Sequence, residues 1–208
     1  MQHLIDADHH NILPSHGEAL LFPNFFTTQE SDTYFDHFKN DVSWIQEPVV
    51  QFGKKRLQPR LTAFLGDEHT GYHADGLTLK AQYWTVPLLS IKAKLEAKFE
   101  TSFNECLLNY YRDGKDYMGW HRNNEHALGE YPVIITVSFG ATRIFQFRDY
   151  KEKMPVVSLE LEHGSILFVK GQTQEFWEQR LPKTSVLVGP RISLTFKLTL
   201  KKGSSDTL

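Results

Sequence analysis

The chain has 208 residues, 40% of them hydrophobic, which fits one globular domain with a sizeable core. Its formal net charge of −2 excludes a bulk polycation, so a nucleic-acid partner would have to be held by local basic patches. The single cysteine, Cys106, excludes an internal disulfide and a cysteine zinc cluster, and we expect it to be a small buried strand residue.

No apolar stretch reaches the roughly 18 residues needed to cross a bilayer. The first residues, MQHLIDADHHNILPSHGE, also lack the basic and apolar regions of a signal peptide. We therefore expect a monomeric cytoplasmic protein with no membrane partner. Aromatic residues make up 13% of the chain, which allows base-stacking side chains but is explained equally well by core packing.

Two helices are predicted in the N-terminal part, after a polar stretch over residues 1–16 that we expect to be a flexible arm. Thr27 and Glu30 have the spacing of a capping box, which predicts a helix over residues 28–40. Pro87 suits the first turn of a second helix. Both segments repeat apolar residues at helical intervals: Tyr34, Phe35 and Phe38 in the first, and Leu88, Ile91, Leu95 and Phe99 in the second.

From about residue 103 the pattern changes to short β-like runs separated by Gly, Pro and charged turns. These runs cover residues 104–111, 132–139, 143–148, 156–162, 165–170 and 191–200. The chain is therefore predicted to have an all-β core with helices at its N-terminal side. We find no internal repeat, low-complexity tract or linker inside residues 17–200, so these residues are expected to form a single domain.

The last run alternates strictly between apolar and polar residues. Its apolar side consists of Ile192, Leu194, Phe196, Leu198 and Leu200, and its polar side consists of Arg191, Ser193, Thr195 and Lys197. On the pattern alone, a solvated outer face is the simpler interpretation of the polar side, because antiparallel sheets usually have one wet face. Alternatively, a strand with two cations on that side lines an anion-binding barrel.

Ordered motifs are spread over most of the chain, at residues 51–54, 59–67, 109–121, 132–148, 163–167, 177–183 and 190–197. In order and spacing they resemble the AlkB family of 2-oxoglutarate- and Fe(II)-dependent nucleic-acid dealkylases, and most of all its duplex-DNA-repair members. The resemblance covers roughly residues 17–200. A run of ordered motifs is far more specific than any one of them.

The resemblance implies a double-stranded β-helix, which is a jelly-roll, cupin-like barrel, over residues 103–200. It also implies a nucleotide-recognition lid at about residues 45–80, leaving residues 201–208 as a flexible tail. Fe(II) and 2-oxoglutarate are the implied cofactors, and DNA, or else RNA, is the implied partner. Family members oxidise the methyl group of an alkylated base, which leaves as formaldehyde while 2-oxoglutarate is decarboxylated to succinate.

The iron ligands of the family follow the pattern His-x-Asp on one strand and a distant His before Leu-Pro-Lys. At these positions the sequence has His121, then Asn123 in place of the carboxylate, and Gln179 in place of the second histidine. Asparagine and glutamine offer neutral carbonyl oxygens, not the negative charge or imidazole nitrogen that Fe(II) prefers. We therefore expect tight iron binding to be lost, although 2-oxoglutarate could help to retain weakly bound metal.

A neighbouring residue could replace a missing ligand, and Glu125, His126 and His163 are the candidates. Glu125 would share a face with Asn123 if the strand continued. His163 matches a family position that is not a ligand, so we expect it to be structural. Such a replacement is the less favoured interpretation, because ligand geometry must be correct to a fraction of an ångström.

Four residues match the family's cosubstrate site: Asn109, Tyr111, Arg191 and Lys197. Arg191 and Lys197 match two arginines near the carboxylates of 2-oxoglutarate. Lysine at the second position keeps the charge but loses the planar fork, so binding there is expected to be weaker. Asn109 and Tyr111 share a strand face and match polar groups that also hold the cosubstrate.

The predicted substrate-binding residues lie mainly in the lid. Phe52 matches a wedge that fills the gap left by a flipped base, and the cations that follow it suit phosphate contact. Tyr72 and Glu125 match residues that touch the target base, whereas Ala74 and Asn124 replace an aromatic and an acidic residue of the relatives. The complete predicted set is Phe52, Lys54, Lys55, Arg56, Arg60, Tyr72 and Glu125.

Three functional hypotheses follow. The first is an AlkB-like domain with lost or severely impaired catalysis that keeps a nucleic-acid-binding surface. The second is an active oxidative demethylase with an atypical metal site. The third, a module that binds something other than nucleic acid, leaves the Phe52 turn and its basic neighbours without a purpose.

Overall fold

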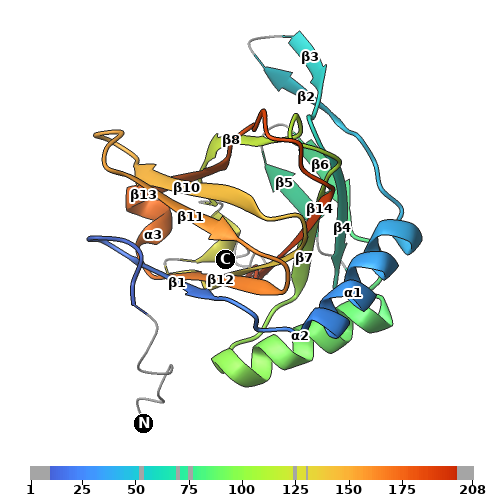
Figure 1. Cartoon of the computed structure of the whole chain (residues 1–208). Coiled ribbons are helices and arrows are strands. Elements are labelled where there is room, and N and C mark those ends of the chain that lie inside the picture. Colours follow the sequence, from blue (N-terminus) through green and yellow to red (C-terminus); the bar gives the residue numbers. More distant parts are fainter. Residues whose placement is uncertain are drawn as a thin grey trace, which may run out of the picture.

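A computed structural model describes residues 10–51, 54–68, 71–74, 77–123, 126–129 and 131–200. Its larger sheet has six antiparallel strands in the order β1-β12-β9-β14-β7-β4 (Figure 1). Strands far apart in the sequence are neighbours in this order, as in a jelly roll. The strands are β1 (Glu18–Phe22), β4 (Leu61–Gly66), β7 (Glu105–Tyr111), β9 (Ile134–Gly140), β12 (Ser165–Lys170) and β14 (Arg191–Lys197).

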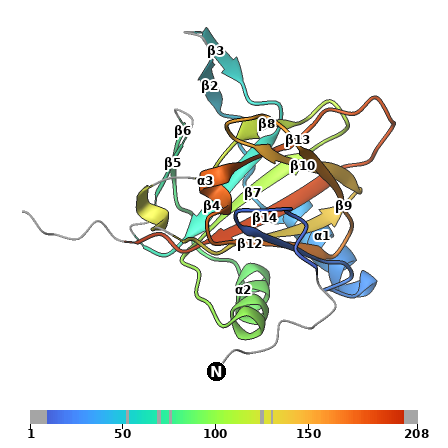
Figure 2. The same ribbon diagram turned by 90° about the vertical axis from the view of Figure 1, so that its left-hand side faces the viewer.

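The smaller sheet has four antiparallel strands in the order β11-β10-β13-β8. They are β8 (Met118–His121), β10 (Arg143–Asp149), β11 (Val156–Leu161) and β13 (Trp177–Leu181). The two sheets form opposite walls of a barrel (Figure 2), and an apolar cluster that includes Phe147, Leu161, Leu167 and Trp177 packs between them. The predicted jelly-roll core is therefore confirmed.

Two helices, α1 (Thr28–Asp41) and α2 (Val86–Phe99), cover the outer face of the larger sheet (Figures 1 and 2). The predicted capping box of α1 is present, since Thr27 Oγ1 accepts from the Glu30 backbone N–H at 3.2 Å and the Glu30 carboxylate accepts from the Thr27 N–H at 2.8 Å. The predicted stripe of α2 buries Leu88, Ile91 and Leu95 in this core. No helix in the described part of the chain is long and apolar enough to cross a membrane.

The polar side of β14 is buried, so the solvated outer face that its pattern favoured is wrong. Arg191, Ser193 and Lys197 are 2%, 3% and 1% exposed. The reason is that helices cover the apolar side of the larger sheet while the smaller sheet covers its polar side. The strand also ends earlier than predicted, at Lys197, and Leu198 and Leu200 are exposed.

Two further hairpins and two short helices complete the described fold. The hairpin of β2 (Pro48–Gln51) and β3 (Lys54–Leu57) projects from the barrel at the top of Figure 1. The other hairpin pairs β5 (Gly71–Ala74) with β6 (Leu77–Lys80), and both hairpins fall within the predicted lid. The short helices are η1 (His126–Leu128) and α3 (Thr173–Phe176).

The last residues of the expected flexible arm pack against the barrel. Leu13 is 3% exposed and belongs to the apolar cluster between the sheets. The indole N–H of Trp177 reaches the carbonyl oxygens of Ser15 and His16 at 2.9 and 3.0 Å. These contacts order residues 11–16, for which the polar composition had indicated a loose segment. Cys106 is fully buried in β7, as predicted.

Candidate iron and cosubstrate site

His121 and Gln179 face each other across the pairing of β8 with β13. They are Cα partners in the ladder, and their side-chain nitrogens, Nε2 of each, are 3.4 Å apart. His121 Nδ1 lies 2.9 Å from the Gly119 carbonyl oxygen, which can only accept, so this nitrogen has the proton. The lone pair of His121 is therefore on Nε2, where the amide N–H of Gln179 points toward it.

Asn123 follows β8 and is 8% exposed. Its backbone N–H donates to the side-chain oxygen of Gln174 at 2.7 Å, which ties this segment to α3. The structure thus brings His121 and Gln179, two of the three predicted ligand positions, into direct contact. The third, Asn123, is buried two residues after His121. Glu125 and Asn124, predicted as a replacement ligand and an altered base contact, lie outside the described residues.

His163, another candidate replacement ligand, has the structural role that we expected. Its Nδ1 accepts from the Gly140 backbone N–H at 2.8 Å, and its Nε2 lies 3.2 Å from Asp32 Oδ1 on α1. Both ring nitrogens are thus used on the helical side of the larger sheet. His126, the remaining candidate, lies in η1.

The donor set around His121 does not fit the usual ligands of non-haem iron. Two histidines and a carboxylate hold Fe(II) in this class of oxygenase, whereas His121, Asn123 and Gln179 supply one imidazole and two neutral amides. In the described part of the chain, no three His, Cys, Asp or Glu side chains are grouped so that they could hold a metal ion. No chemical step is therefore assigned to iron at this position.

Arg191 is a buried cation with few partners. Its Nη2 donates to Ser138 Oγ at 2.8 Å, and its guanidinium lies 5.4 Å from the ring of Tyr111. Its Nε is buried with no hydrogen-bond partner in the described structure. Burial, together with the nearby charge of Arg143, lowers the pKa of Arg191 to about 10.

Among the described residues no carboxylate pairs with this buried guanidinium, which suits an anionic ligand because an anion would supply the missing charge and hydrogen bonds. The inner surface around Arg191 therefore fits a carboxylate of 2-oxoglutarate. When bound, this molecule supplies the electrons that reduce oxygen in the superfamily. The residues predicted to hold it, Asn109 and Tyr111, are on β7 beside β14, and both are buried.

Two predicted site residues have additional neighbours that the sequence did not indicate. Asn109 Oδ1 accepts from Arg60 Nε at 2.8 Å, so a predicted substrate residue and a predicted cosubstrate residue are in contact. Lys197 is at the far end of β14 from Arg191, about 20 Å away along the strand at roughly 3.3 Å per residue. Its Cα partner is Glu105. The role of Lys197 toward the cosubstrate stays a prediction.

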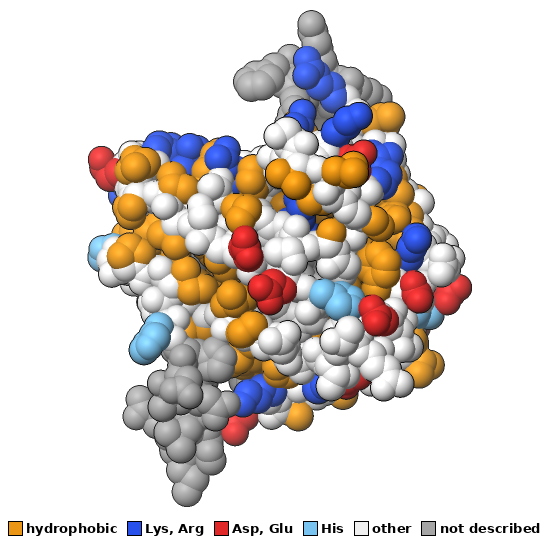
Figure 3. Space-filling view, in the orientation of Figure 1, with side chains coloured by type: hydrophobic (Ala, Val, Ile, Leu, Met, Phe, Trp, Pro, Cys, Tyr) orange, Lys and Arg blue, Asp and Glu red, His pale blue; other side chains and the backbone are white. Residues whose placement is uncertain are grey.

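The predicted substrate residues fall partly outside the described structure. This applies to Phe52 and to Glu125. Lys54 and Lys55 lie in β3, Arg56 is exposed on the same strand, and Tyr72 lies in β5. Lys and Arg side chains are visible on the projecting hairpin at the top of Figure 3. These positions agree with a lid, and the base and phosphate contacts assigned to them stay predictions.

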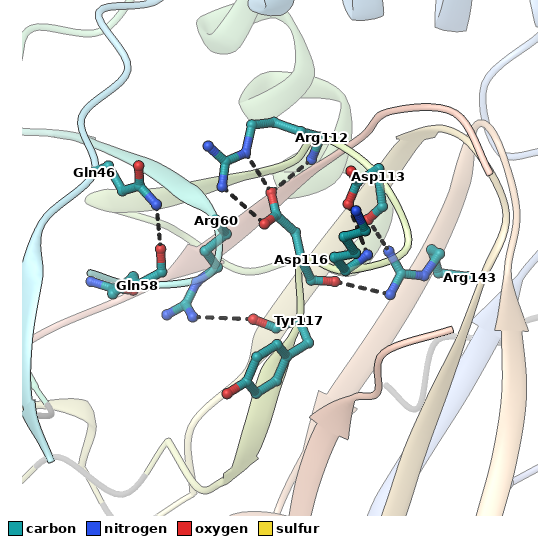
Figure 4. Close-up of polar contacts among 9 residues, drawn as sticks. Gln46, Gln58, Arg60, Arg112, Asp113, Asp116, Tyr117 and Arg143 are labelled. Carbon is teal, nitrogen blue, oxygen red and sulfur yellow. Dashed lines mark hydrogen bonds and ion pairs between the residues drawn. The ribbon is translucent and has the colours of Figure 1, made fainter. Parts of the chain in front are cut away.

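A buried arginine that the sequence did not single out joins two loops at the barrel mouth, and Figure 4 shows its contacts with the loop of Asp113 and Asp116. Arg143, which is 3% exposed, donates to the carbonyl oxygens of Asp113, Asp116 and Pro182 at 3.1, 3.0 and 2.7 Å. The carboxylate of Asp116 accepts two bonds from the guanidinium of Arg112. These contacts link the loop before β8 to the loop after β13, next to the segments that bear His121 and Gln179.

The projecting hairpin is anchored at its base by several hydrogen bonds, of which Figure 4 shows the one between Gln46 and Gln58. Gln46 Nε2 donates to the Gln58 carbonyl oxygen at 2.7 Å, and the Gln58 N–H donates to Glu47 at 3.0 Å. The Tyr117 N–H donates to Pro59 at 3.0 Å, which joins the base of the hairpin to the loop leading into β8. The expected lid is thus fixed at its root to the strand of His121.

The fold is that of an oxygenase barrel, and comparison with known proteins agrees. A family model described as the 2OG-Fe(II) oxygenase superfamily matches residues 18–197, so the chain belongs to this superfamily. The solved structure titled "The structure of OsALKBH1" superposes with a TM-score of 0.65 at 16% identity, covering 89% of this chain and 98% of that one, which supports the fold.

Curated relatives place the chain within the AlkB family of these dioxygenases. It is 35% identical over 193 residues to alpha-ketoglutarate-dependent dioxygenase alkB homolog 3 of Mus musculus, covering 87% of this chain and 66% of that protein. It is also 35% identical over 185 residues to DNA oxidative demethylase ALKBH2 of Homo sapiens, covering 84% and 71%. The chain thus spans a little under two thirds of the first of these relatives.

Proposed function

We propose that this chain is an AlkB-family scaffold that binds nucleic acid and in which oxidative demethylation is lost or severely impaired. The observation that supports this most directly is the contact between Gln179 and His121 at 3.4 Å. Gln179 occupies the position where the family pattern has a histidine. Its amide N–H points toward the lone pair on His121 Nε2, which would otherwise bind metal. Asn123 in place of the carboxylate removes the negative charge that would attract a dication.

The magnitude follows from charge and donor type. Loss of a carboxylate next to a dication in a site of low effective dielectric costs several kcal/mol of binding free energy, on the order of a thousandfold in affinity. Replacement of an imidazole nitrogen by an amide oxygen weakens the site further, because Fe(II) prefers imidazole. The barrel itself does not depend on the metal, since apolar packing between the sheets and under the helices holds it together.

Nucleic acid is the proposed partner. One relative is named a DNA oxidative demethylase, and the projecting β2–β3 hairpin contains Lys54, Lys55 and Arg56. A basic hairpin at the rim of a barrel suits contact with phosphates. We propose a monomer that acts in the cytoplasm, with alkylated DNA, or else RNA, bound at the barrel mouth and a base turned out of its stack.

The alternative is an active 2-oxoglutarate-dependent demethylase with an atypical metal site. Arg191 favours it, because a buried guanidinium with an unpartnered Nε is kept in the position that suits a cosubstrate carboxylate. Together with His121, the two oxygens of a chelating cosubstrate would give a metal three ligands, enough for weak binding.

Anaerobic titration with Fe(II) in the presence of 2-oxoglutarate, followed by a demethylation assay on 1-methyladenine DNA, distinguishes the two. We expect no stoichiometric iron binding and no turnover in the native chain. Asn123→Asp with Gln179→His should restore iron binding, and adding Lys197→Arg should strengthen cosubstrate binding. Multiple turnovers by the native chain with bound iron would refute the proposal.

A matched control makes the same chemical changes outside the barrel. Asn40 is exposed on α1, and Gln146 lies on the outer side of β10, where it bonds Arg180 and Ser158. Asn40→Asp with Gln146→His adds one carboxylate and one imidazole away from the site. This variant should bind no more iron than the native chain, so a gain limited to the site variant reports on site geometry and not on total donor count.

A further inference from the structure

The outer side of the smaller sheet has an unusual set of stacked cations. We define the cation track as three aromatic rings and the five cations that lie on them: Tyr117, Trp120, Tyr150, Arg122, Arg148, Lys153, Arg180 and Lys183. Figure 3 shows Lys and Arg side chains gathered along the upper left rim of the molecule, over the ends of β10 and β13. None of these cations belongs to the predicted substrate or cosubstrate residues.

Each ring of the track holds a cation over its face. The guanidinium carbons of Arg148 and Arg180 lie 4.1 and 4.4 Å from the centre of the Trp120 ring. Arg122 lies 3.6 Å from the ring of Tyr150. Stacking occupies the flat face of a guanidinium and leaves its N–H edge pointing away from the ring, in the geometry that suits a phosphate.

The charges of the track are only partly balanced within the described part of the chain. The carboxylate of Glu178 pairs with Arg148 and, at 3.1 Å, with Lys153. Arg180 uses its Nε to bond Gln146, whereas its two terminal nitrogens make no hydrogen bond or ion pair with the described residues. The nearby Asp149 carboxylate accepts from backbone N–H groups of the β10–β11 turn. A local excess of positive charge remains in a chain whose net charge is −2.

The track lies directly behind the candidate site. Trp120 points outward from β8 while the next residue, His121, points inward at Gln179. Among the described residues, β8 is the edge strand of the smaller sheet. From Tyr117 to Arg122 the chain advances about 16 Å at roughly 3.3 Å per residue, which is long enough to lie beside more than one phosphate of a nucleic-acid strand.

We propose that the cation track binds the phosphodiester backbone of the nucleic-acid strand that runs along β8, next to the nucleotide turned into the barrel. This rests on the proposed function, and it assigns a second contact surface that is separate from the β2–β3 hairpin. Charge complementarity supports a polyanion, and the flat, edge-presenting arginines support phosphate. Arg148 has a positioning role here, because its bonds to Glu178 and Trp120 hold the ring on which Arg180 lies.

The test is fluorescence anisotropy of the full chain with a labelled single-stranded oligonucleotide containing one 1-methyladenine, over a series of salt concentrations. Arg122→Gln with Arg180→Gln should weaken binding about tenfold or more at low salt. The slope of log affinity against log salt should become shallower by about 1.4, since each cation lost removes about 0.7 for a single strand. Lys183→Gln, at an exposed residue, should change binding in the same direction without affecting folding.

Lys39→Gln is the matched control. Lys39 also lies over an aromatic ring, 6.0 Å from Phe35, but on α1 at the helical side of the barrel. This variant should bind as the native chain does. If the native chain binds but the track variants match it in affinity and salt slope, the track assignment is wrong and the proposed function stands. If the native chain binds no nucleic acid, both are wrong. Equal competition by polyglutamate would show that the track takes acidic protein instead.

Discussion

Arg191→Met is expected to stabilise the ligand-free protein and to abolish its response to 2-oxoglutarate. The guanidinium is fully buried, and its pKa falls well below its ordinary value to about 10. At ~1.4 kcal/mol per pH unit, this corresponds to about 3 kcal/mol by which burial disfavours the charged form. The pKa is depressed in the folded state, so this cost is fully present at neutral pH and is relieved only as pH rises above about 10.

The substitution also removes a favourable contact. The bond from Arg191 to Ser138 contributes about 1–1.5 kcal/mol, and its loss offsets part of the gain. The net expectation is a stabilisation of about 1–2 kcal/mol. For a chain of this length that corresponds to a rise in Tm of roughly 2–8 °C, at ~2–4 °C per kcal/mol.

Thermal and urea unfolding with and without 2-oxoglutarate measure both effects. The native chain should gain stability as 2-oxoglutarate is added, because the ligand binds only the folded state. Arg191→Met should start from a higher Tm and show no further shift. A variant that is less stable than the native chain by about 1 kcal/mol or more, or one that still responds to 2-oxoglutarate, would refute the view of Arg191 as an under-partnered cation awaiting an anion.

Three other outcomes are expected. Arg143→Met should destabilise the chain by about 2–4 kcal/mol in urea unfolding, the opposite sign to Arg191, because Arg143 donates to three carbonyl oxygens. Glu30→Gln should lose stability at neutral pH, and the difference from the native chain should disappear in acid. The backbone N–H of Thr27 and then Lys94 lower the pKa of Glu30, so its contribution is present above about pH 4.5 and is lost as pH falls through the lowered value. Cys106, whose pKa is raised by burial, should react with a thiol reagent only at the rate of unfolding.

Much of the fold could be predicted from local patterns. The capping box of α1, the apolar stripe of α2 and the runs that became β7, β9, β10, β11, β12 and β14 all follow from periodicity. β8 and β13 are different, because each is short and mixes aromatic, charged and amide residues. Their pairing depends on contacts between distant segments, which a single sequence does not contain.

The burial of β14 shows where local pattern reading fails. Alternation correctly separated Ile192 from Arg191, but it did not show which layer would cover each side. Only the closure of the second sheet over the first buries Arg191, and that closure is a property of topology. Within the sequence, the resemblance to a family of oxygenase barrels was the one feature that favoured a buried polar side for this strand.

The candidate site was located by motif, but its contacts were not. The positions of His121 and Gln179 follow from the family pattern, whereas their direct contact follows from the register of β8 and β13. Arg143 was missed because a lone arginine at the start of a strand looks like a surface residue. Its three carbonyl partners come from two loops that are far apart in the chain, one with Asp113 and Asp116 and the other with Pro182.

The register irregularity in β8 has a consequence for which sequence changes the site tolerates. Gln179 pairs with His121 and Leu181 with Met118, so β8 has three steps where β13 has two. The surplus residue allows both His121 and Met118 to face inward while Trp120 faces outward. A side chain added at Gly119 would meet open space. Substitution of Gly119 should therefore be harmless. Deletion of Gly119 would instead turn either His121 or Met118 out of the barrel. At this position the length of the chain matters more than the identity of the side chain.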